Sequence, residues 1–376
     1  MIQEQRILQN FIHLTGIDSE SFHERGVADA LKTTLRTLGL KVSEDDADKT
    51  GGWKSKNSAG NVLGVLEGNR EGEPILFSSH MDTVKPGVGK HPIVGASGKI
   101  TSDGTTVLGA DDIAGVAAIL EALTVIREEN LSHPRIEVLF PVAEELYGKG
   151  SALFDYGKIQ AKTAYCLDLT EEIGTAAIAA PTILSVNIAV KGRSAHAGFN
   201  PEDGINALTA AANALSKLPT GYVAGDTTVN FGTISGGSIT NAVPGLVTIG
   251  GEVRSMRHEE AQRRAETIRK VFEEEAAKIG AKAEITVTEE VHAYEMQPDE
   301  SVVTRFVSAV EEAGLGEAKL TTTFGGSDNN HFAKHGLRGI VLSCAMHDVH
   351  SVHEYTDLHE MAKCAEIVLR LMTGAL

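Results

Sequence analysis

Two hydrophobic patterns alternate along the first part of the chain. In RILQNFIHLTG (6–16) and GVADALKTTLRTLG (26–39), apolar residues recur at helical spacing, and each segment closes on a glycine, a common helix stop. The segments ILFSSHMDT (75–83) and IEVLFPVAEE (136–145) begin as short apolar runs, as expected of strands covered on both faces. Between them lies DIAGVAAILEALTVIREEN (112–130), a strong helix pattern. Strands that alternate with helices predict an α/β fold, in which a mixed but mostly parallel sheet carries helices on both faces.

The pattern changes near residue 181. From there the chain has a strand, helix, strand, strand, helix, strand order, in the segments ILSVNIAVKG, DGINALTAAANALSKLP, TVNFGTISGG, GLVTIGGEVRS, HEEAQRRAETIRKVFEEEAAKIG and AEITVTEE. This is the order of a ferredoxin-like α+β unit. Alternating helix and strand patterns then resume, beginning with SVVTRFVSAVEEAG (301–314). We therefore predict one α/β domain, formed by residues 1–181 and 294–376, that is interrupted by an inserted domain at 182–293.

Length and charge narrow the class of protein. A chain of 376 residues exceeds the size at which a single hydrophobic core usually stops growing, which agrees with two domains. The formal net charge of −17 argues against partners that attract Lys and Arg surfaces. We therefore expect neither nucleic acid nor an anionic membrane as a partner.

The sequence also predicts the cellular location of the protein. The segment MIQEQRILQNFIHLTG (1–16) has no basic stretch followed by an apolar core, so it does not resemble a signal peptide. The longest uncharged run (173–190) contains Gly, Pro and Asn, which favour strand, turn and strand over a membrane helix. The three cysteines are too scattered for a disulfide framework or a cysteine-type zinc site. We expect a cytoplasmic protein.

The predicted strand that begins at Ile136 ends in two adjacent glutamates, Glu144 and Glu145. Two like charges at the end of a buried strand repel each other and are costly to remove from water. A bound cation would offset that cost. The rest of the chain can therefore be searched for further ligands of a cation.

Four other polar motifs follow predicted strands or lie in loops. They are His80 and Asp82 after a strand, Asp111 and Asp112 before a helix, Asp168 after AYCL, and the histidine-rich HDVHSVHEYTDLHE (347–360). Each has an ordinary interpretation when taken alone: a chance pair, a helix cap, a solvated strand end and a polar loop. Acids at a helix N-terminus cap free N–H groups, and we expect Asp112 to be that cap.

Taken together, these motifs predict a metal centre. The acids and imidazoles belong to several strand ends of one α/β domain, and such ends share one edge of a sheet. His, Asp and Glu without Cys suit divalent ions such as zinc, manganese or cobalt. Five candidate ligands exceed the needs of one catalytic zinc, so two ions that share a carboxylate fit better. Two cations would also offset the repulsion between the paired glutamates.

The chain resembles the dizinc exopeptidase family of tripeptide aminopeptidases, acylases and glutamate carboxypeptidases, and most closely its peptidase T-like branch. The resemblance rests on HMD (80–82), GADD (109–112), AEE (143–145), LD (167–168) and HSVHEY (350–355). It extends over nearly the whole chain, through the further motifs GRSAHAG, GTISGGSITNAVP, EVRS and GGSDNNHF. It implies a zinc exopeptidase-like fold in which the inserted domain is a lid that also forms a homodimer.

The resemblance also implies a role for each residue of the metal centre. His80 and Asp168 would bind one metal ion, Glu145 and His350 would bind the other, and Asp111 would bridge the two ions. Asp82 would orient the ring of His80, as carboxylates near metal-bound histidines often do. Glu144 would be the general base that takes the proton of a water molecule activated by the two ions.

Five residues would contact substrate, three in the predicted lid and two in the later motif GGSDNNHF. By resemblance, His196 would polarise the scissile carbonyl, from its own chain or from a partner subunit, and Asn241 would belong to a lid loop. Arg254 would bind a substrate carboxylate. Gly325 and Gly326 have a simple interpretation as a turn, but they would also let the backbone approach bound substrate.

The expected activity is metal-dependent release of the N-terminal residue from short peptides, with two divalent ions per subunit and zinc as the favoured metal. One alternative keeps the same fold and ligands, namely an N-acyl amino acid amidohydrolase (acylase) or a carboxypeptidase. Another is an inactive metal-binding or interaction protein. Loss of Glu144 or of a ligand would have signalled that last class, and none is lost.

Overall fold

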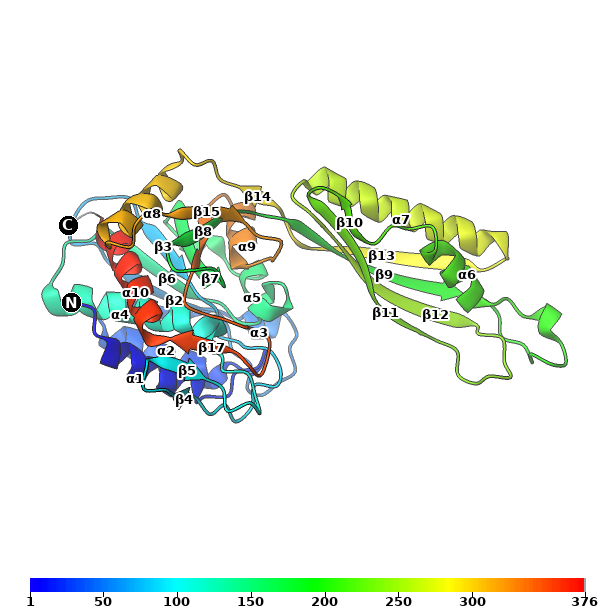
Figure 1. Ribbon diagram of the computed structural model, residues 1–376, viewed down its shortest axis with the longest axis horizontal. Coiled ribbons are helices and arrows are strands. Elements are labelled where there is room, and N and C mark those ends of the chain that lie inside the picture. Colours follow the sequence, from blue (N-terminus) through cyan, green and yellow to red (C-terminus); the bar gives the residue numbers. More distant parts are fainter. Residues whose placement is uncertain (375–376) are drawn as a thin grey trace. The chain divides into compact units, whose positions relative to one another are not determined.

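The computed structural model describes residues 1–374, which form two compact units (Figure 1). Unit 1 contains Met1–Ala179, Glu295–Thr323 and the chain from Ser327 onward. Unit 2 contains Ala180–Tyr294 together with the short segment Phe324–Gly326. This division lies close to the insertion expected at 182–293, but it adds a tripeptide that the hydrophobic pattern does not single out.

The sheet of unit 1 has nine strands among the described residues. In chain order they are β1 (Lys41–Glu44), β2 (Val62–Leu66), β3 (Ile75–Ser78), β6 (Ile136–Phe140), β7 (Thr163–Leu169), β8 (Thr175–Ala180), β14 (Tyr294–Glu295), β15 (Lys319–Thr322) and β16 (Arg338–Ser343). The spatial order is β1-β2-β6-β3-β7-β16-β8-β14, with β15 beside β8. The central strands β6, β3, β7 and β16 run parallel. Strand β2 pairs antiparallel with β1 and β6, whereas β8 pairs antiparallel with β16 and parallel with β15. The prediction of a mixed sheet with a parallel centre is confirmed.

Helices cover the sheet of unit 1. They are α1 (Glu4–Thr15), α2 (Arg25–Thr37), α3 (Ala47–Thr50), α4 (Ala110–Glu129), α5 (Lys149–Ala152), α8 (Ser301–Glu312), α9 (Asp328–Lys334) and α10 (Leu358–Thr373), with 3-10 turns η1 (Glu144–Leu146) and η2 (Tyr156–Lys158). Helix α4 packs against α1, α10 and β7. It is buried over most of its length because it has apolar residues on all sides.

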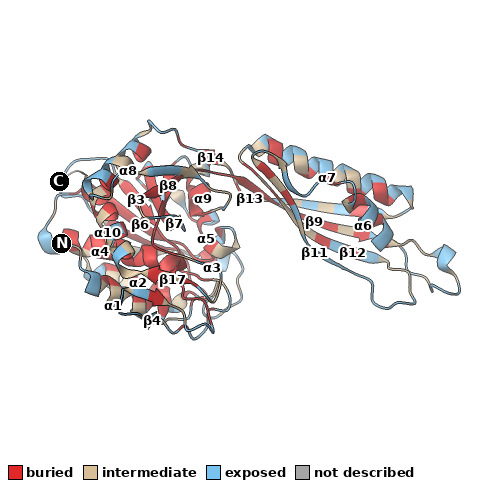
Figure 2. Cartoon of the chain, viewed as in Figure 1, coloured by how far each residue is buried: buried red, intermediate tan, exposed pale blue. Residues whose placement is uncertain are grey.

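The alternation of side chains along β3 and β7 explains why both faces of the sheet need cover. Leu76 of β3 and Ala164 of β7 are paired, and they cluster with Phe332 of α9. Phe77 and Tyr165 come next along each strand, so they point to the opposite face. There the two rings stack at 5.5 Å, and the Tyr165 hydroxyl donates to a carbonyl of α8. Figure 2 shows the resulting band of buried strands at the centre of unit 1.

A small sheet brings the histidine-rich loop back toward α4. It consists of β4 (Ile93–Val94), β5 (Lys99–Thr101) and β17 (Tyr355–Asp357), in the order β17-β5-β4. Tyr355 pairs with Thr101, and the N–H of Ser102 donates to the carbonyl of Glu354 at 3.2 Å. This pairing fixes the segment that follows His350.

Unit 2 is an antiparallel sheet with two helices. Its elements are β9 (Thr182–Lys191), η3 (Pro201–Asp203), α6 (Ala207–Leu215), β10 (Gly221–Ala224), β11 (Thr227–Gly236), β12 (Leu246–Ser255), α7 (His258–Lys278) and β13 (Lys282–Val291). The strand order β10-β11-β12-β9-β13 is ferredoxin-like, with β10 added at one edge. Val186, Ile188 and Val190 alternate along β9 and join the core that α6 and α7 cover. Among residues 1–374, no helix is both long enough and apolar enough to cross a membrane.

Candidate metal centre at the carboxyl edge of the sheet

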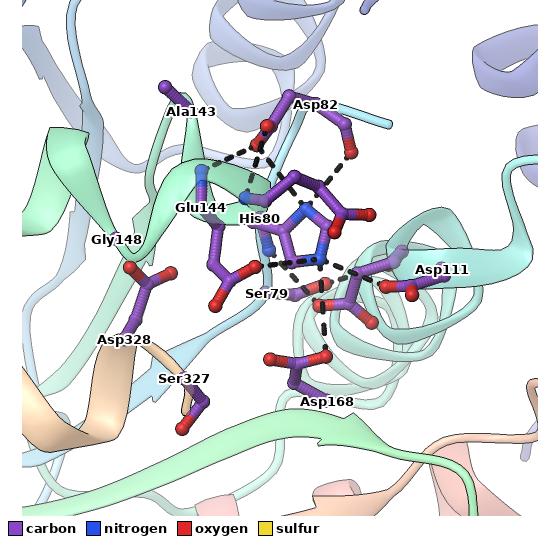
Figure 3. Close-up of polar contacts among 12 residues, drawn as sticks. Ser79, His80, Asp82, Asp111, Ala143, Glu144, Gly148, Asp168, Ser327 and Asp328 are labelled. Atoms are coloured by element: carbon purple, nitrogen blue, oxygen red, sulfur yellow. Dashed lines mark hydrogen bonds and ion pairs between the residues drawn. The ribbon is translucent and has the colours of Figure 1, made fainter. Parts of the chain in front are cut away.

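Polar side chains gather where the parallel strands of unit 1 reach their carboxyl ends. His80 follows β3, and Glu144 and Glu145 follow β6. Asp168 is the second-last residue of β7. Asp111 joins them from the start of α4. Neighbouring parallel strands end at the same edge, and this brings together residues that are far apart in sequence. Figure 3 shows the carboxylates of Asp111, Glu144 and Asp168 turned toward the ring of His80.

The first group of candidate ligands contains His80, Asp111 and Asp168. Nε2 of His80 lies 3.0 Å from Oδ1 of Asp111 and 3.9 Å from Oδ1 of Asp168. One ligand atom from each of the three residues lies within 4.8 Å of the others. An imidazole nitrogen and two carboxylates thus converge on one point, as the ligands of a divalent ion would.

The second group contains Asp111, Glu145 and His350. Nε2 of His350 lies 2.9 Å from Oε2 of Glu145 and 3.2 Å from Oδ2 of Asp111. These three residues also offer ligand atoms within 4.8 Å of one another. Asp111 therefore presents Oδ1 to the first group and Oδ2 to the second. This is the arrangement expected of a carboxylate that bridges two ions.

The chemistry of both groups fits divalent metal ions. Oε1 of Glu145 is buried and has no hydrogen-bond partner among the described residues. A buried carboxylate oxygen without a partner is costly, and a cation in the second group would satisfy it. The ligand set consists of imidazole nitrogens and carboxylate oxygens, which zinc, manganese and cobalt accept.

Burial and crowding shift the pKa values of these groups in the metal-free chain. Burial raises the pKa of Asp168 well above its ordinary value, and repulsion from Glu144 adds to the effect. Burial likewise raises the pKa of Glu145, with Asp111 as the next cause. Burial alone would raise the pKa of Asp111, but its hydrogen bonds to His350 and His80 hold it below the ordinary value. Hydrogen bonds to Asp111 and Glu145 raise the pKa of His350 to about 10. Without metal, the site therefore holds protons that its ligands would have to release.

Asp82 holds two parts of the site in place. Nδ1 of His80 lies 2.9 Å from the backbone carbonyl of Asp82 and 3.4 Å from its carboxylate. The Asp82 carboxylate accepts hydrogen bonds from the backbone N–H groups of Glu144, at 2.9 Å, and Glu145, at 3.3 Å. The shorter contact to the ring of His80 is thus the carbonyl, while the carboxylate fixes the glutamate pair.

The backbone around the glutamate pair is unusual. Ala143 and Tyr147, which flank η1, have φ values of 51° and 67°. His350 also has a positive φ, of 60°. Left-handed conformations cost non-glycine residues on the order of 1 kcal/mol each, and they persist only where the surroundings hold them. The hydrogen bonds of Asp82 are one such restraint on the glutamate loop.

The expectation that Asp112 caps α4 is wrong. The N-cap residue is Gly109, which has no side chain that could form a capping hydrogen bond. The Asp112 carboxylate instead accepts the backbone N–H of His80 at 3.0 Å and lies 3.3 Å from the thiol of Cys344. Asp112 therefore anchors the strand end that carries His80.

The capping role belongs to Glu354, to which the sequence analysis assigned no function. Oε2 of its buried carboxylate accepts the N–H groups of Leu108 and Gly109, at 2.6 and 2.8 Å. Oε1 accepts the N–H of Asp111 at 2.9 Å. Glu354 thus fixes the backbone of Asp111, the residue that the two candidate ligand groups share. Its place inside the motif HSVHEY was the only signal for it in the sequence.

Two further buried acids lie near the loop that carries Glu144. Asp328, at the start of α9, accepts a hydrogen bond from the hydroxyl of Ser151, and burial raises its pKa to about 7. Glu24 accepts the N–H of Ala143 at 3.1 Å, and burial raises its pKa to about 8. Burial also raises the pKa of Glu144 well above its ordinary value, and repulsion from Asp328 reinforces this. Neither acid stands out in the sequence, although the motif GGSDNNHF contains Asp328.

In unit 2, two predicted substrate residues lie in adjacent loops. The N–H of Ala197 donates to the carbonyl of Asn241 at 2.9 Å, which places that loop beside His196. Nδ1 of His196 accepts the N–H groups of Gly198 and Phe199, at 3.1 and 3.2 Å. An Nδ1 that accepts leaves the proton of a neutral ring on Nε2. His196 can therefore donate a hydrogen bond through Nε2.

The other predicted substrate residues of unit 2 have structural contacts of their own. The guanidinium of Arg254 pairs with both carboxylate oxygens of Glu252, at 2.9 and 3.0 Å, and also donates to the carbonyl of Phe324. Binding of a substrate carboxylate by Arg254 would have to compete with Glu252. A Cβ on Gly326 would lie 3.2 Å from side-chain carbons of Ile183 and Val291, so close packing already accounts for this glycine. Gly325 precedes it in the same segment, Phe324–Gly326.

Two models of known protein families match parts of this chain, and their matches overlap between residues 178 and 214. A model of the peptidase dimerisation domain matches residues 178–280. A model of peptidase family M28 matches residues 61–214.

Similar proteins match over the whole length. The uncharacterized protein YqjE of Bacillus subtilis is 39% identical, over all of both chains. The crystal structure of aminopeptidase PepT from Bacillus cereus has a TM-score of 0.90 and 36% identity, covering 99% of this chain and 98% of that one. The crystal structure of a tripeptidase from Staphylococcus aureus has a TM-score of 0.94 and 34% identity, with the same coverage.

Proposed function

The chain belongs to the peptidase T-like family of aminopeptidases, and we propose on this basis that it is a metal-dependent exopeptidase that releases the N-terminal residue of short peptides. One observation carries the metal dependence. Two groups of ligands share Asp111 at the carboxyl edge of the sheet, next to a buried glutamate that belongs to neither group.

We assign the ligands as the two groups suggest. His80 and Asp168 would hold one ion, Glu145 and His350 would hold the other, and Asp111 would be shared by both, with zinc as the favoured metal and manganese or cobalt as alternatives. When bound, the two ions would lower the pKa of a water molecule and polarise the carbonyl of the peptide bond. Asp82, Asp112 and Glu354 keep the ligands in position through backbone hydrogen bonds.

Glu144 is the proposed general base. Its Oε2 lies 3.9 Å from Nε2 of His80, and its backbone N–H is held by Asp82. Glu144 would take the proton of the attacking water and deliver it to the leaving amine, which is the usual task of a carboxylate beside a reacting centre. The buried surroundings of Glu144, with Asp328 close by, favour the protonated state that the second step needs.

Unit 2 would complete substrate recognition. His196 would donate through Nε2 to the developing oxyanion, and the loop with Asn241 would support it. Arg254, Gly325 and Gly326 remain candidates for contacts with the peptide. Closure of a lid over bound peptide would exclude water from the reaction.

We further propose that the protein is a cytoplasmic homodimer that associates through unit 2. The match to a peptidase dimerisation domain supports this. Several large apolar side chains of unit 2 are also exposed, including Phe199 at 86%, Ile239 at 62% and Ile234 at 55%. Burial of these side chains against a second subunit would remove their apolar surface from water.

The substrate class can be tested with one peptide in three forms. We expect trialanine to be hydrolysed at least about tenfold faster than N-acetyl-trialanine, because a site that recognises the free amine leaves polar groups unpaired when the amine is blocked. Mass spectrometry should identify alanine and a dipeptide that keeps the original C-terminus. Trialanine labelled at its last residue distinguishes this product from that of a carboxypeptidase. Faster turnover of N-acetyl amino acids than of any tripeptide would instead identify an acylase.

Metal binding should release protons. At neutral pH the metal-free chain keeps a proton on His350, whose pKa is about 10, and the raised pKa values of Asp168 and Glu145 favour protons there too. Ligands must lose these protons to bind a metal ion, so the affinity for zinc should rise as the pH rises from about 6 to about 8. Calorimetry in two buffers of different ionisation enthalpy measures the protons released. An affinity independent of pH would contradict the ligand assignment.

A further inference from the structure

A separate cluster of metal-binding side chains lies wholly within unit 2. It contains His258, Glu289 and His292, which offer ligand atoms within 4.8 Å of one another. None of the three belongs to the catalytic assignment above. The cluster is half-buried, with side-chain exposures of 18% for His258, 28% for Glu289 and 38% for His292.

The fold brings these residues together from two elements. His258 is the first residue of α7, Glu289 lies near the end of β13, and His292 follows β13 directly. Helix α7 packs along β13, so the start of the helix meets the end of the strand. The two imidazole rings face each other with centroids 4.1 Å apart.

The distances suit a small divalent ion. Nδ1 of His292 lies 3.3 Å from Oε1 of Glu289, and Nε2 of His258 lies 3.9 Å from Oε2 of the same carboxylate. Two ligands that each lie about 2.1 Å from a tetrahedral zinc are roughly 3.3 Å apart. The cluster therefore needs only small side-chain adjustments to close on an ion, because the Glu289 carboxylate already lies near one nitrogen of each ring.

A hydrogen bond presets the ring of His258. Nδ1 of His258 lies 3.2 Å from the hydroxyl oxygen of Thr182, and that oxygen also accepts the N–H of Ala293 at 2.9 Å. If Nδ1–H donates to Thr182, Nε2 keeps its lone pair for a metal ion. Histidines that bind metals usually have such a partner on their second nitrogen. The side-chain nitrogen of Gln262 lies 2.7 Å from Nε2 of His258, and a flipped amide would present its oxygen there as a further ligand.

One member of the cluster, Glu289, lines a surface pocket, and all three side chains are partly exposed to solvent. A surface pocket of about 260 Å³ is lined by Gln262 and Glu289, together with Leu184, Arg269 and Val287. Metal sites need an entry path of this kind. Three protein ligands also leave a fourth position for water or for Gln262.

We propose that His258, Glu289 and His292 form a third metal site of this chain, which takes zinc or a similar divalent transition ion. The ion would fasten the start of α7 to the end of β13. Thr182 and His292 lie near the points where the chain enters and leaves unit 2, so the ion would brace the base of the inserted domain. The site is structural, and it does not depend on the proposed catalytic function.

The test compares the zinc content of full-length chains. Metal-free protein is equilibrated with zinc, and bound zinc is measured by mass spectrometry. We expect wild-type protein to hold one zinc more per chain than the double variant H258Q/H292Q. The matched control is H13Q/H91Q, which removes two exposed histidines of unit 1 and should bind as much zinc as the wild type. Because the measured quantity is a difference between chains, failure of the catalytic metal assignment would not alter it.

A second measurement locates the ion. Zinc should slow hydrogen exchange near residues 258–262 and 288–293 in the wild type but not in H258Q/H292Q. If the double variant does not fold, Glu289→Gln serves instead, and the zinc affinity of this site should fall at least about tenfold. Equal zinc content in the folded double variant and the wild type, or unchanged affinity in Glu289→Gln, would overturn the proposal.

Discussion

Replacing Glu144 with glutamine is expected to lower the rate of peptide hydrolysis by a factor on the order of 10²–10⁴ and to leave the metal content unchanged. Glutamine keeps the size of the side chain and its place beside His80, but it cannot accept a proton from water. Glu144 belongs to neither group of ligands, so both ions should remain. The measurements are kcat with trialanine and metal analysis of the same sample.

Two controls separate this effect from a general loss of structure. Glu171→Gln makes the same chemical change at an exposed position of unit 1 and should leave kcat unchanged. Glu145→Gln makes it one residue further along the chain, at a proposed ligand, and should lower the metal content as well as kcat. Full activity of Glu144→Gln would show that another residue moves the proton.

Replacing Asp111 with alanine should remove more metal than any other single substitution in the site. Asp111 offers Oδ1 to the group of His80 and Oδ2 to the group of His350. Its loss would therefore weaken the binding of both ions at once and leave the buried His80, the exposed His350 and two carboxylates without their shared partner. We expect the catalytic metal content to fall from two ions per chain to less than one, and hydrolysis to fall at least as far as in Glu144→Gln.

Single-site variants provide the comparison for Asp111→Ala. Asp168→Ala and Glu145→Ala each remove a ligand of one ion only, so each should cost about one ion per chain. Asp299→Ala removes an exposed acid of unit 1 and should cost none. If Asp111→Ala loses no more metal than Asp168→Ala, the shared position of Asp111 is wrong.

Much of the fold could be predicted from the sequence because its signals are local. The apolar runs at 75–83 and 136–145 predicted covered strands, and the helical spacing of 112–130 predicted the buried helix α4. The change of pattern near residue 181 indicated the inserted domain. The added strand β10 and the attachment of Phe324–Gly326 to unit 2 carry no comparable periodic signal.

The candidate ligands could also be found from the sequence, because parallel strands deliver their ends to one edge whatever the details of packing. His80, Asp111, Glu145, Asp168 and His350 remain the proposed set, and the structure places them in two groups. What the sequence could not decide is which atoms hold them there. Asp112 was expected to be a cap, yet it binds the backbone of His80 instead.

The supporting contacts depend on tertiary structure alone. Glu354 caps the start of α4 across 243 positions of the chain, and Asp82 binds the backbone of Glu144 across 62. Such hydrogen bonds join segments that are far apart in the sequence. They produce no periodic pattern of residues, so composition and spacing cannot reveal them. The sequence by itself determined which residues can bind metal and where the strands end. The packed fold decided which carboxylates join the candidate ligand groups and which bind backbone N–H groups, because a buried carboxylate takes whichever positive group the neighbouring segments bring within reach.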